Sequence, residues 1–76
     1  MSELSEKIKE VGRNYLGFAA DRYMERQCKI HMDKSLEDLE KSDLDEFSRW
    51  IKNTAPLITD QETSRKLRDE LLDLKK

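Results

Sequence analysis

Cys28 and His31 are the residues of this sequence best suited to nucleophilic or metal chemistry. They lie three positions apart in a segment of helical periodicity, so their side chains can share one helix face. A catalytic nucleophile also needs an orienting group and an oxyanion site, for which no glycine-rich turn is at hand. A structural zinc site needs four ligands, of which one chain supplies two good ones, and a symmetric dimer could complete the set. We therefore expect no enzyme activity, no metal and no cofactor, and interpret the pair as a packed thiol beside a partly exposed imidazole.

A basic stripe in the same region suggests a different chemistry. Arg22, Arg26 and Lys29 follow one another at spacings of four and three, which places them on one side of a helix. Such a stripe can neutralise phosphates. Against this, 17 acidic residues outnumber 15 basic ones, and Asp21 and Glu25 are expected to pair with the stripe. A small nucleic-acid-associated regulator is thus the alternative function, which an exposed and unpaired stripe would favour.

The acidic residues are concentrated in one short stretch. Between positions 35 and 46 six carboxylates accompany a single lysine, which gives a local charge of −5. A patch of one sign can steer a basic partner toward a protein. The simpler explanation is that carboxylates favour the starts of helices. The candidate acidic patch consists of Glu37, Asp38, Glu40 and Asp43.

A belt of apolar and small residues in the first helical segment carries the main functional hypothesis. The stretch 15–20 is apolar on every side, and nearby glycines and alanines would let a second backbone approach closely. A short hairpin can cover only one side of such a belt. We therefore expect a non-enzymatic helical protein-interaction or regulatory module that forms a homodimer, although a compact monomer would also account for the belt. The expected association surface consists of Tyr15, Leu16, Phe18, Ala19 and Tyr23.

Three helical segments must position these residues. The first is expected from about 3 to 32, the second from about 43 to 53, and a short extra helical turn lies near 35–40. The third begins at a capping box, Thr59 to Glu62, and continues with leucines at helical spacing. Short linkers favour antiparallel neighbours. The sequence thus predicts an all-α fold, in which a long N-terminal helix packs against a C-terminal helical hairpin as a three-helix bundle.

Length and composition limit what such a bundle can be. A chain of 76 residues is one domain, 1–76, and buries only about 60% of the surface that its unfolded form exposes. Its one cysteine excludes an internal disulfide and fits a reducing compartment. The N-terminus lacks the pattern of a signal peptide, and no apolar run approaches the roughly 20 residues of a membrane span. We expect a cytoplasmic protein whose partner is another protein or a second copy of itself. A nucleic acid is the alternative partner, disfavoured by the excess of acidic residues, and no membrane association is expected.

Overall fold

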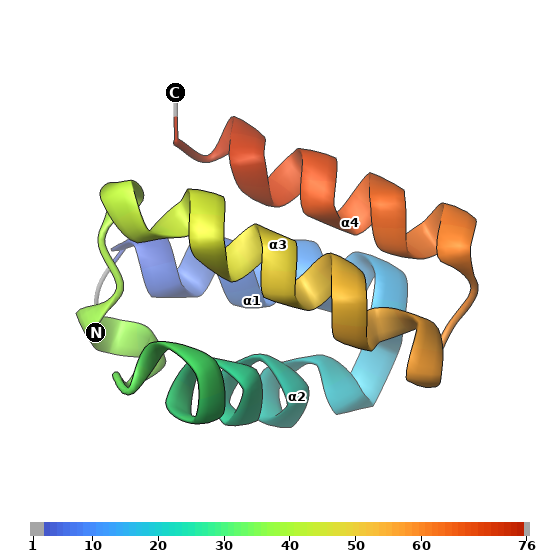
Figure 1. Cartoon of the computed structure of the whole chain (residues 1–76), viewed down its shortest axis with the longest axis horizontal. Helices are drawn as coiled ribbons and strands as arrows, with labels where there is room; N and C mark the ends of the chain where they lie inside the picture. The colour runs from blue at the N-terminus through green and yellow to red at the C-terminus, as the bar shows by residue number, and fades with distance from the viewer. Residues whose placement is uncertain (1–2, 76) are drawn as a thin grey trace.

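The computed structural model describes residues 3–75, and within this range the chain is helical and has no strand. Four α-helices alternate in direction (Figure 1). α3 packs against α4 as a hairpin, and α1 packs against both α2 and α4. The predicted all-α bundle, with its N-terminal helical part packed against a C-terminal hairpin, is confirmed. The four helices are α1 (Glu3–Leu16), α2 (Ala20–Gln27), α3 (Leu44–Thr54) and α4 (Gln61–Asp73).

The N-terminal part differs from the single helix expected over 3–32. The chain reverses in the 3₁₀ turn η1 (Gly17–Ala19), and α2 packs back across α1. Gly17 has a φ of 66°, a left-handed conformation that costs glycine little because it has no Cβ. Gly12 lies where α1 and α2 touch, since a Cβ there would meet Met24 Cε at 3.0 Å and Ala20 Cβ at 3.1 Å. The small residues thus bring two parts of one chain together.

The segment between α2 and α3 closes one end of the bundle. α2 continues into a π-helical turn, η2 (Cys28–Met32), and ends at Asp33, whose φ of 56° is left-handed. The predicted extra turn is present as η3 (Leu36–Asp38), and a second 3₁₀ turn, η4 (Lys41–Asp43), leads into α3. Leu36 and Leu39 are buried, which anchors this segment to the core.

The start of α4 lies one residue later than the predicted capping box requires. Asp60, rather than Thr59, is the N-cap, and its Oδ1 accepts a hydrogen bond from the Thr63 N–H at 2.6 Å. This bond satisfies one of the free amides of the first turn and lowers the pKa of the Asp60 carboxyl. The preceding turn, η5 (Ala55–Leu57), contains Pro56 and ends α3.

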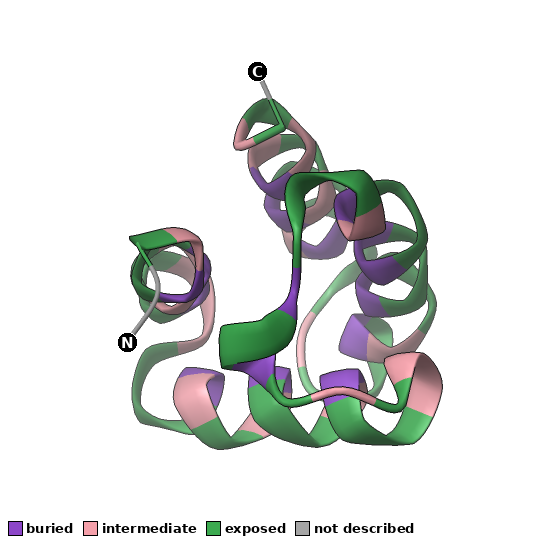
Figure 2. Cartoon of the chain, turned by 90° about the vertical axis from the view of Figure 1, so that its left-hand side faces the viewer, coloured by how far each residue is buried: buried purple, intermediate pink, exposed green. Residues whose placement is uncertain are grey.

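The buried residues lie on the inward sides of the helices (Figure 2). Phe47 of α3, at the centre of the apolar face of that helix, is fully buried. The turns η1 and η5 lie at the same end of the bundle (Figure 1). Three large apolar side chains at that end, Phe18, Leu57 and Ile58, remain exposed. The core consists of Ile8, Met24, Cys28, Leu36, Leu39, Leu44, Phe47, Ile51, Ala55, Leu67 and Leu71.

Candidate interaction surface

Phe18 projects into solvent from the turn between α1 and α2. Its side chain is fully exposed, at 107% of the reference accessibility. The residues on either side explain why: Leu16 packs against the core before the chain reverses, and Ala20 is buried after it. Only the residues of the turn itself are left outside. An exposed phenylalanine is therefore a consequence of how this turn is built.

The five residues of the expected association surface do not form one open belt. Tyr15, Leu16 and Tyr23 are half-buried against the core, whereas Phe18 and Ala19 are exposed. The Tyr23 hydroxyl is hydrogen-bonded to Thr54 Oγ1 and lies 3.5 Å from the Ile51 carbonyl oxygen, which ties α2 to α3. Its burial raises the pKa of the Tyr23 phenol.

Ile58 completes a hollow at this end of the bundle. Phe18, Ala19 and Tyr23 line it together with Ile58, which is 53% exposed. Sequence analysis did not select Ile58. The signal was an apolar pair, Leu57 and Ile58, placed directly after a proline in a linker, where polar residues are usual.

The basic stripe of α2 is exposed and unpaired. Arg22, Arg26 and Lys29 make no ion pair with any residue in the range 3–75. The prediction that Asp21 and Glu25 would neutralise them is wrong, because both carboxylates turn toward α1. Asp21 binds Arg13 through two contacts, 2.7 Å between Oδ2 and Nη2 and 3.0 Å between Oδ1 and Nε. Glu25 Oε1 lies 3.8 Å from Lys9 Nζ. The Arg13 hydrogen bonds lower the pKa of Asp21.

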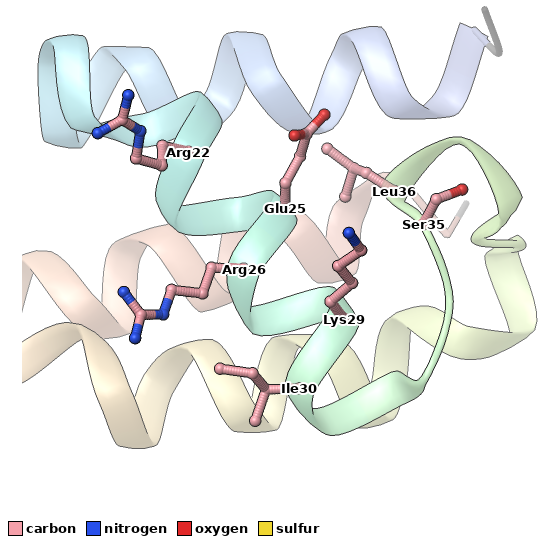
Figure 3. A pocket seen from close by; sticks show the side chains of 7 residues that line it. All are labelled: Arg22, Glu25, Arg26, Lys29, Ile30, Ser35 and Leu36. Atoms are coloured by element: carbon pink, nitrogen blue, oxygen red, sulfur yellow. The ribbon is translucent and has the colours of Figure 1, made fainter.

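A second hollow lies along the C-terminal half of α2 (Figure 3). Leu36 and Ser35 of the following segment form one side of it, and Ile30, 59% exposed, lies near its other end. The Arg22 and Arg26 side chains extend to the same side of α2, while Glu25 points toward α1. Both arginines also line the Phe18 hollow, so the two hollows adjoin. We call this combined surface the α2 face, made of Phe18, Arg22, Arg26, Lys29, Ile30 and Ile58.

Two residues of the candidate acidic patch, Asp38 and Asp43, make local hydrogen bonds, whereas Glu37 and Glu40 lie on the open surface. Asp43 is half-buried, accepts a hydrogen bond from the Glu40 N–H at 3.0 Å and pairs with Lys34 Nζ at 2.8 Å. The Lys34 contact, followed by that of the Glu40 amide, lowers the pKa of Asp43. Asp38 accepts a hydrogen bond from the Ser35 hydroxyl at 3.0 Å. Glu37 and Glu40 are exposed and make no ion pair within 3–75.

Cys28 and His31 occupy different environments. The Cys28 thiol is fully buried, and this burial raises its pKa to about 11. The His31 ring stacks on Trp50 of α3, with 4.0 Å between ring centroids and 10° between ring planes. The range 3–75 contains no group of three or more His, Cys, Asp and Glu side chains placed to hold a metal ion.

Comparisons with protein-family models, with curated proteins and with solved structures find no match to this chain. None of the helices described in residues 3–75 combines the length and apolar character needed to cross a membrane. The arguments for function therefore come from the α2 face itself.

Proposed function

We propose that this chain is a non-enzymatic protein-interaction module and that the α2 face is its binding surface. The observation that carries the proposal is the full exposure of Phe18 beside an adjoining pair of hollows. Large apolar side chains that cluster at the surface of a small protein mark interaction sites. Ile30 and Ile58 extend the exposed apolar surface on either side.

The residue types on the α2 face are those that dominate protein interfaces. Aromatic residues and arginine supply most binding hot spots, usually where an anchor fills a pocket surrounded by less important contacts. Phe18 is such an anchor, and Arg22 and Arg26 stand next to it. The turn η1 and α2 fix the backbone positions from which these side chains project, so binding does not have to order the backbone.

Site-specific photocrosslinking in the native host tests the proposal. We expect benzoylphenylalanine in place of Phe18 to give discrete protein adducts. Placed at Arg49, an exposed position on α3, it should give none. The Phe18 adducts should also disappear when Arg22 and Arg26 are changed to glutamate. Adducts of equal abundance from both positions would show that the α2 face has no special role.

Nucleic-acid association is the second candidate, because the basic stripe is exposed and unpaired. Three cations give a slope of at most about −2.7 when log affinity is plotted against log salt concentration. So few phosphate contacts give only weak binding at physiological salt. The neighbouring acidic residues Glu37 and Glu40 would oppose a polyanion. Fluorescence anisotropy with a 20-nucleotide single strand, compared with a variant in which all three cations are alanine, decides this candidate.

A further inference from the structure

We infer that the α2 face binds an acidic amphipathic helix of a partner protein, an assignment that rests on the proposed function. Its first basis is charge. Arg22 and Arg26 lie on α2, and Lys29 follows in η2. The two carboxylates of α2 that could neutralise these cations are held by Lys9 and Arg13 of α1. The packing of α2 on α1 therefore leaves three cations open to a partner's carboxylates.

The second basis is the placement of apolar surface at both ends of the stripe. Ala19 belongs to the hollow at one end, and Ile30 belongs to the hollow at the other. The two residues are eleven positions apart, and α2 spans most of this interval, at about 1.5 Å per residue. A partner helix has residues i and i+11 on one face, three turns apart. Apolar residues at these positions, with carboxylates at i+4 and i+7, match the order of apolar, basic and apolar groups on the α2 face.

A helix suits this surface better than an extended segment. One common mode of binding an extended peptide adds it as a strand to a sheet edge, and residues 3–75 contain no strand. The backbone amides of α2 are engaged in their own helix, so recognition depends on side chains. A partner helix satisfies its own backbone and offers side chains alone, which is the helix-in-groove mode of recognition.

Synthetic peptides provide the direct test. The probe is a fluorescein-labelled, alanine-rich helical peptide of 18 residues with leucine at i and i+11 and glutamate at i+4 and i+7. Fluorescence anisotropy against the full chain should show saturable binding at 50 mM NaCl that weakens at least threefold at 300 mM NaCl. A peptide with lysine in place of both glutamates should not bind, and one with alanine in place of both leucines should bind at least fivefold more weakly.

Protein variants locate the contact. R22E/R26E should weaken binding of the glutamate peptide at least tenfold and should gain binding to the lysine peptide. The matched control, R49E/K52E, makes the same change of charge on exposed residues of α3 and should alter binding less than twofold. Circular dichroism verifies that both variants are folded. The gain with the lysine peptide is a result that misfolding cannot produce.

Several outcomes would overturn the inference. These are no binding of the glutamate peptide below 1 mM, an equal loss in both double variants, or binding of the single-stranded oligonucleotide through the three cations. Dimerisation of the protein alone at the peptide-binding concentration, abolished by R22E/R26E, would identify a second copy as the occupant instead. If the peptide fails while the Phe18 crosslink still yields protein adducts, the proposed function stands and only the acidic helix is wrong.

Discussion

The two glycines of the N-terminal segment have different roles, which their identity in the sequence does not reveal. Gly17 needs its left-handed φ, and a Cβ there would meet no atom within 4 Å. Gly12 is helical, and a Cβ there would press on Met24 and Ala20 of α2. One position is constrained by its backbone and the other by its neighbours. In the sequence, each glycine indicates only that another backbone can approach closely at that position.

Substitution of Gly17 by alanine should therefore destabilise the protein through backbone strain alone. We expect a loss of about 1–2 kcal/mol in the free energy of unfolding, the cost of a left-handed conformation for a residue with a Cβ. Gly17→Asn should lose less, because asparagine tolerates this region better. Urea unfolding followed by circular dichroism measures both. Equal stability of Gly17→Ala and wild type would mean that the turn does not require the left-handed conformation.

The buried Cys28 thiol should make the protein less stable at alkaline pH. Its pKa is about 11 in the folded chain against an ordinary value of 9.0, so the unfolded chain loses its proton first as pH rises. The stability that this thiol contributes is complete below pH 9 and is lost between pH 9 and 11. We expect a loss of about 2 kcal/mol between pH 8 and pH 10.5.

Cys28→Ala is the control for this pH effect, because burial also raises the pKa of the Tyr23 phenol, so that group contributes to alkaline destabilisation as well. The difference in unfolding free energy between wild type and the variant should shrink with rising pH by the same amount. A constant difference would show that the thiol does not carry the effect.

At the scale of the elements, periodicity predicts helix well but does not predict where a helix is divided. A glycine inside a helix costs only about 1 kcal/mol, so a helical pattern interrupted by Gly17 is compatible with a continuous helix and with a broken one. The break is favoured by tertiary packing, which buries Ala20, Met24 and Cys28 against α1 and the core. The same packing determines the state of the basic stripe. Spacing places its three cations on one face, but only the fold directs Asp21 toward Arg13.

The N-cap of α4 offers a test at this scale, because the sequence predicts Thr59 as the N-cap whereas the structure has the adjacent residue, Asp60. Asp60→Ala should cost about 1 kcal/mol, the usual effect of removing an N-cap side chain, whereas Thr59→Ala should change stability by less than about 0.5 kcal/mol. Asp60→Asn keeps an acceptor for the Thr63 amide and should lie between these two. Thermal unfolding of the three variants ranks them. A larger loss for Thr59→Ala would restore the predicted capping box.

At the scale of the whole molecule, a net charge of −2 conceals a strong separation of charge. The α2 face is basic, and the segment that follows it carries exposed Glu37 and Glu40. Such a surface can orient a partner that is itself charged on one side, and it disfavours a long polyanion. Composition therefore gives little information about binding here, because the arrangement of charge depends on which carboxylates the fold pairs internally.

The sequence and the structure lead to different expectations for the oligomeric state. The hypothesis of a homodimer depends on an apolar belt over residues 15–20. In the structure the exposed large apolar side chains at this end of the bundle are Phe18, Leu57 and Ile58. Phe18 alone supplies at most about 250 Å² of the roughly 800 Å² that each partner buries in an interface of standard size, so a dimer would need the charged residues beside it as well. A two-fold contact through the α2 face would also bring Arg22 and Arg26 of both copies together, which is unfavourable.

We therefore expect sedimentation equilibrium to show a species of 9.1 kDa at about 10–100 μM, the mass of one chain. Weak association should emerge only near millimolar concentration, and Phe18→Ser should remove it because that residue is the largest apolar group exposed. Since a dimer gains stability with concentration and a monomer does not, thermal unfolding at the same concentrations gives an independent check. A species of twice the mass at low micromolar concentration would contradict this expectation. It would mean that the apolar end of the bundle binds a second copy, and that the exposed cations of α2 lie beside that contact rather than within a site for another protein.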